Sequence, residues 1–470
     1  MENTSPPPSK LPQELYDEIV DGLYDHPPSL KSCALTFRSF LVKSQRHLFC
    51  NVGLSTDPRH PEVLWHRSGD IFSFADANRF RPILEGSPHL ASYILNLRIT
   101  TNSRDRKQNG ANENPDQRSK REKSEQDVTF CLRQLRHLRC LSINTQQSSL
   151  IFTNPNFLKV LQEVVALPSL ICLDQSSTLE SPFKQRSHLQ YLSICMDGGR
   201  LLSLKDQSPA RHQNRCRVEF LRVRQTSSGV PKNFDHYLER SLDIRHLRCL
   251  YVTTRSTFSS HSIMRNLLRV CGRNLKELIF YLEDYSDSVV LPVGGLDFSL
   301  EELLSLRSLR IRLVAAETNP FLLQLAELLR SLPAGPTNRL EQLFIHANCF
   351  RLESTESIIE PWEGLWNLVS DLDYFPCLKK LEFKGFFGMG SEEKVQPNVA
   401  AWQSQFGGKR SCSSRLKVRA DIMRFEESFG NPYPFWPDDG GNGPWCKVIE
   451  PVNPYEVYTI LRQPYVGDAF

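Results

Sequence analysis

The sequence has no long apolar run. No stretch within its 470 residues approaches the roughly 18 consecutive apolar residues of a membrane-spanning helix. The first ten residues, MENTSPPPSK, also lack the charged and apolar regions of a secretory signal peptide. We therefore expect an intracellular protein, cytoplasmic and/or nuclear, with no membrane partner.

The chain also lacks a strong excess of charge of either sign. Lys and Arg number 57 against 53 Asp and Glu, which gives a net charge of +4. Proteins that bind nucleic acid through charge usually carry a clear basic excess, so we expect no nucleic-acid partner. The short basic run at 118–123 contains Glu122, which favours a solvated loop over a nuclear signal.

Thirteen cysteines are present without any Cys-x-x-Cys motif. Most of them lie inside apolar phrases, as Cys140 does, so we expect reduced, buried thiols that act as small hydrophobic groups. His137 and His246 each precede a cysteine by three residues, but no second ligand pair completes a four-coordinate zinc site. We expect no metal and no cofactor.

Motifs for catalysis are missing as well. There is no Gly-x-Ser-x-Gly elbow, and the carboxylates are too dispersed to suggest an acid–base pair. The segment 407–411 is similar to a phosphate-binding loop, but Gln403 replaces its first glycine and Arg410 follows the lysine. The glycines at 440–443 lack the flanking strand and helix of a nucleotide site. We therefore expect a protein that is not an enzyme.

A repeated phrase dominates the middle of the chain. The hexapeptide at 136–141, Arg-His-Leu-Arg-Cys-Leu, recurs letter for letter at 245–250. Both belong to a wider pattern, Leu-x-x-Leu-x-(Ile/Val/Phe), with a degraded copy at Leu170-Leu173. The nine full copies are Ile94-Leu97-Ile99, Leu138-Leu141-Ile143, Leu189-Leu192-Ile194, Val218-Leu221-Val223, Leu247-Leu250-Val252, Leu275-Leu278-Phe280, Leu306-Leu309-Ile311, Leu340-Leu343-Ile345 and Leu378-Leu381-Phe383.

The spacing of the copies indicates a strand, a turn and a helix in each unit. From Leu192 onward the central leucines are 29, 29, 28, 31, 34 and 38 residues apart, near or above the upper range of leucine-rich repeats. Candidate helices lie at 157–167, 262–271 and 321–332, where apolar residues recur on one face. The pattern predicts an α/β leucine-rich-repeat solenoid over 91–385, with parallel strands on the concave side and helices on the convex side.

In such an array the leucines form the core, and binding falls to strand residues that point the other way. These residues mix basic, aromatic and hydroxyl groups, a composition that suits recognition of a protein or of a phosphorylated motif. It would equally suit a solvated face with no partner. We predict target binding by Arg222, Arg224, Tyr251, Thr253, Tyr281, Arg310, Arg312 and His346; further candidates on this face are Ser142, Asn144, Ser193, Glu382 and Lys384.

The first fifty residues follow a different, helical pattern. Leu11, Leu15, Ile19 and Leu23 recur at steps of four and form one apolar stripe on a helix. A second apolar rhythm resumes at Leu30, and a third short helix is expected at 39–48. Three helices in about forty residues bury too little apolar surface to be secure alone. This predicts a docking module that gains stability from a partner.

The residues of this module resemble the F-box. The resemblance is carried by Leu11-Pro12-x-Glu14-Leu15-x-x-x-Ile19 and Leu30-x-x-Cys33-Ala34-Leu35. Segments 44–49 and 87–99 are similar to F-box proteins abundant in mushroom-forming fungi; the resemblance weakens through the repeats and ends near residue 385. It implies a Skp-type adaptor as partner and, through it, cullin and RING subunits. The matching positions are Leu11, Pro12, Leu15, Ile19, Leu30, Cys33 and Leu35; in the competing interpretation these residues only close a small helical subdomain.

The chain is thus expected to divide into five parts. A disordered N-terminus at 1–10 precedes the F-box-like module at 11–50 and a helical linker at 51–90. The repeat array at 91–385 contains an insertion at 101–127, which its polar composition predicts to be disordered. The segment 386–470, rich in Gly, Pro and aromatic residues, either caps the array with strands at 416–419 and 455–458 or docks on a partner through 431–437.

Together these features predict a non-catalytic substrate receptor of a cullin-RING (SCF) ubiquitin ligase. The module would bind the adaptor, and the repeats would recruit a target protein for ubiquitin-dependent degradation. The alternative is a leucine-rich-repeat interaction scaffold that is not coupled to ubiquitination. A third possibility is a hydrolase within the aromatic C-terminal segment.

Overall fold

The computed structural model of the chain forms two compact units, one within residues 1–174 and one within residues 175–438. The structure describes residues 12–24, 26–55, 73–101, 115–145, 155–175, 187–196, 215–225, 238, 241–254, 257–283, 298–351, 355–371, 373–387 and 417–424. The predictions for 1–10, for Leu11 and for the strand at 455–458 lie outside these residues. Each unit is an α/β structure built on parallel strands.

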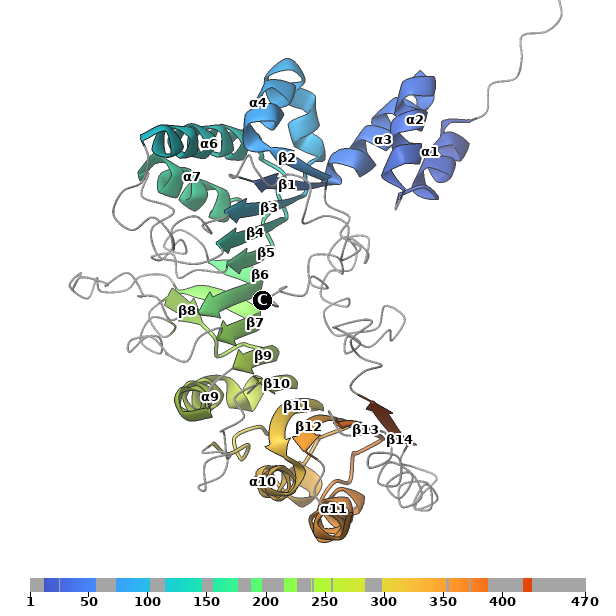
Figure 1. Ribbon diagram of the computed structural model, residues 1–470, viewed down its shortest axis with the longest axis vertical. Helices are drawn as coiled ribbons and strands as arrows, with labels where there is room; N and C mark the ends of the chain where they lie inside the picture. The colour runs from blue at the N-terminus through green and yellow to red at the C-terminus, as the bar shows by residue number, and fades with distance from the viewer. Residues whose placement is uncertain are drawn as a thin grey trace, which may run out of the picture. The chain divides into compact units, whose positions relative to one another are not determined.

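The first unit begins with three helices that pack together, as Figure 1 shows. They are α1 (Gln13–Asp21), α2 (Pro27–Thr36) and α3 (Arg38–Cys50). Two prolines begin α2, where the missing N–H donor costs little, and the His26 side chain accepts a hydrogen bond from the Ser29 N–H at 3.3 Å. The three helices predicted from the sequence are therefore confirmed. We refer to α1, α2 and α3 as the helical module.

A parallel sheet follows the helical module directly. Its strands are β1 (Asn51–Ser55), β2 (Ser73–Asp76), β3 (Asn96–Thr101), β4 (Cys140–Thr145) and β5 (Cys172–Gln175), in the order β2-β1-β3-β4-β5. Pairing brings Val52, Leu97 and Leu141 to one level, and all three side chains are buried. The repeated phrase thus produces strands stacked in register.

Helices α4 (Ala77–Gly86), α6 (Pro115–Gln134) and α7 (Pro155–Val165), with the 3-10 turn η1 (Pro88–Tyr93), complete this unit. The helix predicted at 157–167 is confirmed by α7. Two predictions are wrong in part. The segment 51–90, predicted to be helical, contains the strands β1 and β2, and residues 115–127 of the insertion predicted to be disordered belong to α6. In the C-terminal half of α6, Val128, Cys131 and Leu132 are buried. Their burial stabilises a helix whose first half is polar.

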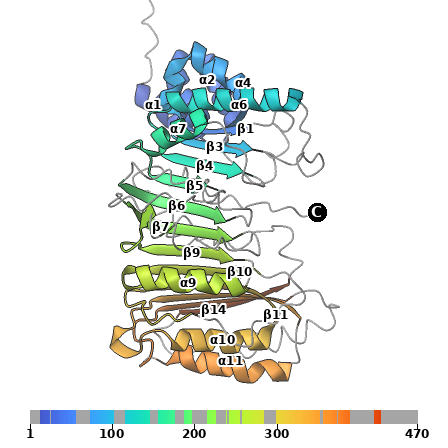
Figure 2. The same ribbon diagram turned by 90° about the vertical axis from the view of Figure 1, so that its left-hand side faces the viewer.

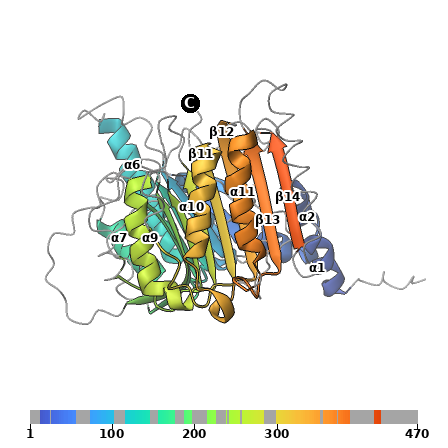
Figure 3. The same cartoon turned by 90° about the horizontal axis from the view of Figure 1, so that it is seen from below.

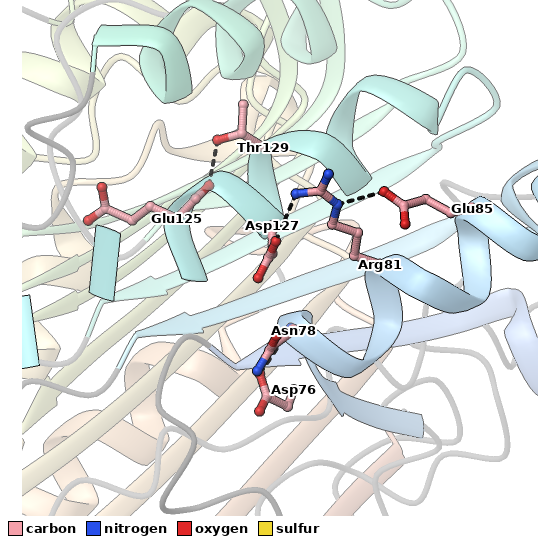
Figure 4. A network of polar contacts seen from close by, with 7 residues as sticks. All are labelled: Asp76, Asn78, Arg81, Glu85, Glu125, Asp127 and Thr129. Atoms are coloured by element: carbon pink, nitrogen blue, oxygen red, sulfur yellow. Dashed lines mark hydrogen bonds and ion pairs between the residues drawn. The ribbon is translucent and has the colours of Figure 1, made fainter. Parts of the chain in front are cut away.

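Polar contacts join α4 to α6, as Figure 4 shows. Arg81 of α4 lies 2.7 Å from Glu85 of the same helix and 3.1 Å from Asp127 of α6. The Arg81 guanidinium also lies 4.8 Å from the ring centroid of Phe130. Asp127 is almost fully buried, so this ion pair compensates part of the cost of removing its charge from water.

The second unit is a larger parallel sheet, and Figure 2 shows β6, β7, β9 and β10 stacked in that order. Its order is β6-β7-β9-β10-β11-β12-β13-β14, and β8 pairs beside β7. The strands are β6 (His188–Met196), β7 (Cys216–Gln225), β8 (Leu242–Asp243), β9 (Cys249–Thr254), β10 (Glu277–Glu283), β11 (Ser308–Glu317), β12 (Gln342–Arg351), β13 (Lys380–Phe387) and β14 (Lys417–Arg424).

Helices α9 (Thr257–Cys271), α10 (Thr318–Arg330) and α11 (Thr355–Ser370) lie on the same side of this sheet, as Figure 3 shows. Short 3-10 turns η2 (Gly272–Asn274) and η3 (Gly335–Thr337) follow α9 and α10. Helix α9 contacts β9, and α10 contacts β11 and β12. The helices predicted at 262–271 and 321–332 are confirmed, and α11 is a further helix between β12 and β13 for which no residue range was predicted from the sequence.

The leucines of the repeated phrase form the interior between sheet and helices. Strand pairing places Leu250, Leu278, Leu309 and Leu343 at one level across β9 to β12, and each is at most 1% exposed. Burying one such side chain contributes about 1.5–3 kcal/mol. The predicted leucine core is confirmed in the described strands.

A second ladder precedes the strands. The backbone N–H of Lys276 donates to the Arg248 carbonyl at 2.8 Å, that of Arg307 to Lys276 at 2.8 Å, and that of Glu341 to Arg307 at 2.8 Å. The Lys379 N–H continues the series to Glu341 at 2.9 Å. These bonds align the turns that enter each strand, so that the register of one strand fixes that of the next.

Strand β14 confirms the strand predicted at 416–419. It pairs with β13 in parallel, and Val418 stands level with Leu381. Within the described residues, no helix combines the length and apolar character required to cross a membrane.

Candidate interaction surfaces

The helical module has a small interior. Val20 of α1 is fully buried and Leu30 of α2 is 1% exposed, while the rings of Tyr16 and Phe40 meet edge to face at 5.1 Å. Tyr16 and Val20 are four residues apart and therefore share one face of α1. This face packs inward, and it is not the predicted stripe of Leu15 and Ile19.

Polar contacts hold α1 against α3. The Asp21 carboxylate lies 2.9 Å from Lys43 Nζ and 2.7 Å from His47 Nε2, and Gln13 Nε2 donates to the Ser39 carbonyl at 2.8 Å. Burial acts to raise the pKa of Asp21, but the hydrogen bonds and charges of Lys43 and His47 outweigh burial and lower it. The ionised carboxylate is therefore the form that the folded module favours.

Large apolar side chains remain uncovered on the helical module. Leu15 is 43% exposed, Ile19 is 49% exposed and Leu35 is 89% exposed. Phe37 and Val42 are also exposed, so five of the eight exposed large apolar residues in the described part of the chain belong to the helical module, four on its helices and Phe37 between α2 and α3. Exposed apolar side chains gathered on one small region are a common feature of surfaces that contact other proteins. We call Leu15, Ile19, Leu35, Phe37 and Val42 the apolar module surface.

The seven predicted adaptor-binding residues therefore separate into groups. Leu15, Ile19 and Leu35 belong to the apolar module surface, and Pro12 is exposed beside them in sequence at the start of α1. Cys33 is half-buried. Leu30 must be corrected from a surface contact to an interior residue, because it fills the space between helices. Leu11 lies outside the described residues.

The predicted target-binding residues occupy two adjacent levels of the second sheet, on the face opposite to the leucines. Pairing sets Ser193, Arg222, Tyr251, Ile279, Arg310, Phe344 and Glu382 at one level. The next level holds Arg224, Thr253, Tyr281, Arg312, His346 and Lys384. On the same face, the level two residues earlier in each strand holds Phe220, Cys249, Glu277, Ser308, Gln342 and Lys380. We call these three levels the arginine–aromatic face.

Arginines stack on aromatic rings along this face. The guanidinium carbon of Arg222 lies 4.4 Å from the centroid of Tyr251, and that of Arg310 lies 4.3 Å from Phe344. Arg312 lies 5.6 Å from Tyr281. Stacking restricts a long side chain and directs its N–H edge.

The aromatic rings also contact one another. Tyr251 and Tyr281 meet edge to face at 5.2 Å, and Arg222 Nη2 donates to the Tyr251 hydroxyl at 3.4 Å. As a result, Tyr251 and Phe344 are each only 4% exposed. The sequence suggested a fully solvated face as one possibility, and the structure corrects it, because the large side chains cover each other.

Two carboxyl groups accompany these cations. Glu277 lies 3.6 Å from Arg310 Nε, and Glu382 lies 3.3 Å from Lys380 Nζ. Burial raises the pKa of Glu277 to about 7, although Arg310 and a hydrogen bond with Cys249 act to lower it. Glu277 therefore changes charge near neutral pH.

Burial likewise dominates at Tyr281. It raises the pKa of the phenol, Tyr251 raises it further, and the positive charges of Arg312, Arg310 and Arg222 oppose the shift. The hydroxyl, which is protonated at neutral pH even at the ordinary tyrosine pKa, is shifted further from ionisation. All three guanidinium charges act on this one side chain.

Glu277, Phe344 and Lys380 were missed by the sequence prediction. Glu277 and Lys380 stand one level before the predicted rows, at the same alternation of the strand. Extending the period of two by one step toward the N-terminus would have found them. Phe344 was missed because an apolar residue beside Leu343 reads as core.

Seven of the described cysteines are buried and none of the described cysteines forms a disulfide, and their burial agrees with the prediction of thiols that act as small hydrophobic groups. Burial raises the pKa of Cys249 well above its ordinary value, and the charge of Glu277 adds to this shift. Among the described residues, no three His, Cys, Asp or Glu side chains gather into a group that could hold a metal ion.

Comparison with known proteins adds no assignment. No protein-family model matches the chain, and no curated protein matches it either.

Proposed function

We propose that this chain is an F-box substrate receptor, a non-catalytic subunit of a cullin-RING (SCF) ubiquitin ligase that works inside the cell, in the cytoplasm, the nucleus or both. The helical module docks on a Skp-type adaptor, and the parallel strands act as leucine-rich repeats that hold a target protein. The receptor then raises the effective concentration of the target beside the ubiquitin-carrying enzyme.

The exposure of Leu15, Ile19 and Leu35 is the observation that carries this proposal. If these residues only closed a small subdomain, their side chains would be buried, yet Tyr16, Val20 and Leu30 fill that role. An isolated module of this size gains from covering its uncovered apolar side chains with a partner. Leu15, Ile19 and Leu35 are also positions at which the sequence resembles the F-box.

Co-purification with a Skp-type adaptor tests the proposal. The wild-type chain is expected to bind, and Leu15→Asp combined with Ile19→Asp is expected to weaken binding by at least about a hundredfold, because two charges would be buried at the contact. Leu323→Asp on α10 is the matched control, since Leu323 is also an exposed helical leucine. This control should bind like the wild type.

Two results would contradict the proposal. One is a wild-type chain that does not bind the adaptor, which would favour an interaction scaffold without a ligase. The other is a double variant that folds and binds as tightly as the Leu323→Asp control. Circular dichroism of all three proteins establishes that each is folded.

A further inference from the structure

The first unit places two buried cysteines on neighbouring strands. Cys140 begins β4 and Cys172 begins β5, and Figure 2 shows these strands side by side. The Arg139 carbonyl accepts a hydrogen bond from the Cys172 N–H at 3.0 Å. The Leu95 carbonyl accepts one from the Cys140 N–H at 3.1 Å in the same way, and Asn96 stands level with Cys140. By the same pattern, Cys140 stands level with Cys172.

The two thiols lie within reach of each other. Residues level on neighbouring strands are separated by about 4.8 Å and point to the same face of the sheet, and the Cα atoms of disulfide-bonded cysteines usually lie about 4.4–6.8 Å apart. A side-chain hydrogen bond with Cys140, together with burial, raises the pKa of Cys172 well above its ordinary value. Both side chains are 1% exposed. The two sulfur atoms can therefore be joined without separating the strands.

A matched cysteine in the second unit lacks such a neighbour. The hexapeptide at 136–141 recurs at 245–250, so Cys249 has the same local sequence as Cys140, and it is also 1% exposed. Strand pairing places Phe220 and Glu277 level with Cys249, one on each side. Cys140 therefore differs from Cys249 in the thiol on the next strand, and not in burial or local sequence.

We infer that Cys140 and Cys172 form an oxidation site, at which hydrogen peroxide joins β4 to β5 through a reversible disulfide. The thiolate of one cysteine attacks an oxygen of the peroxide; an S–O bond forms, the O–O bond breaks and water leaves, which gives a sulfenic acid. The second thiol attacks the sulfenic sulfur; the S–S bond forms, the S–O bond breaks and a second water leaves. The two thiols lose two electrons in total, and these electrons reduce one peroxide to two waters.

Burial makes the first step slow and the second step selective. The thiolate is the reactive form, and burial of Cys172 disfavours it, so the first step requires local opening. Strand β5 has only four residues, and few backbone hydrogen bonds must break to open it. Once one sulfur is oxidised, the thiol level with it forms the disulfide before further peroxide produces a sulfinic acid.

The test uses the folded full chain and hydrogen peroxide as the probe. After treatment the remaining thiols are blocked with N-ethylmaleimide, and the peptides are mapped by mass spectrometry without reduction. The Cys140–Cys172 link is expected to be at least about tenfold more abundant than any link that contains Cys249. Dithiothreitol should restore both thiols.

The same treatment of the unfolded chain is a control that requires no variant. Cys131 lies nine residues before Cys140, whereas Cys172 lies 32 residues after it. Closing the shorter loop costs less entropy, so denaturant should shift the dominant partner of Cys140 from Cys172 to Cys131.

Variants then locate the site. Cys172→Ser is expected to abolish the link and to leave a sulfenic acid at Cys140 that reacts with dimedone, whereas Cys249→Ser should form the link like the wild type. A disulfide also constrains the unfolded chain. Oxidation should therefore move the denaturant midpoint of the first unit upward in the wild type and leave it unchanged in Cys172→Ser.

Two results would overturn the inference. One is a folded wild-type chain that forms no Cys140–Cys172 link, or forms the same mixture of links as the unfolded chain. The other is a Cys249→Ser protein that loses the link as completely as Cys172→Ser does. Because both cysteines lie outside the apolar module surface, these results do not depend on whether the chain binds an adaptor.

Discussion

At the scale of single residues, Glu277 links the stability of the second unit to pH. Its carboxyl group is buried beside Arg310, and its pKa rises from 4.5 to about 7 on folding. The folded state therefore binds a proton that the unfolded state releases. The resulting stability is complete below about pH 4.5 and is lost as the pH rises through 7.

The variant Glu277→Gln should remove this dependence. We expect the free energy of unfolding of the wild type to fall, relative to that of the variant, by up to about 3 kcal/mol between pH 4.5 and pH 8. Denaturant unfolding of both proteins across this range measures the difference. If the difference in free energy of unfolding between the two proteins stayed constant across this pH range, the pKa of Glu277 would not be raised by folding.

The pair of Arg81 and Asp127 is a second residue-scale feature, in the first unit. Asp127 is buried, so Arg81→Ala would leave its charge without its ion-pair partner across α4 and α6. We expect this variant to be less stable than the wild type, and the double variant with Asp127→Asn to recover part of that loss. Thermal unfolding of the two proteins provides the measurement; a single variant as stable as the wild type would show that the pair contributes little.

At the scale of elements, the helical module distinguishes two leucines that look alike in the sequence. Leu30 is interior and Leu35 is exposed, although both lie on α2. Leu30→Ala should destabilise the chain by about 2–5 kcal/mol, because it opens a cavity. Leu35→Ala should change the free energy of unfolding by no more than about 0.5 kcal/mol, because Leu35 is exposed.

Chemical unfolding of the two variants measures the contrast, with the intrinsic helix preference matched because both replacements are leucine to alanine. Under the proposed function, Leu35→Ala should weaken adaptor binding more than Leu30→Ala does. If Leu35→Ala were the more destabilising change, the assignment of the apolar module surface would be wrong.

Strands β3, β4, β6, β7 and β9 to β13 were predictable because each carries a copy of one apolar phrase. Leu250 and Val252, for example, alternate with Tyr251 and Thr253, and this period of two fixes both the strand and its two faces. The first helix was harder. Its residues Leu15 and Tyr16 begin two neighbouring apolar stripes, and only packing against Phe40 decides which stripe turns inward.

Helix α6 and the position of α11 were not identified from the sequence, for different reasons. The first half of α6 is highly polar, so its helical state depends on the buried second half and on its contacts with α4 and α7. Helix α11 contains Pro361, which a sequence pattern reads as a break. The arginine–aromatic face was only partly predictable from the sequence, because Glu277 joins it through strand pairing.

At the scale of the whole molecule, the buried cysteines report on cooperativity. Burial raises the pKa of Cys131 and Cys271 to about 12, so these thiols should resist alkylation in the folded protein. Cys377 is exposed and should react first. The described cysteines thus span a wide range of protection.

Alkylation at increasing denaturant, followed by peptide mass spectrometry, should show Cys216, Cys249 and Cys271 becoming reactive at one midpoint. All three belong to the second unit, whose strands share one register. Cys377→Ser should leave this midpoint unchanged. Separate midpoints for Cys216 and Cys271 would show that the unit unfolds in parts.

The register of the second sheet also sets regular distances along the arginine–aromatic face. Neighbouring strands lie about 4.8 Å apart, whereas residues of an extended chain advance by about 3.3 Å. An extended target segment that runs across the strands would therefore advance by about three residues for every two strands that it crosses. Arg222 and Arg310, three strand steps apart at one level, would be met by residues four or five positions apart. The face would in this way measure the spacing within a bound segment as well as its charge.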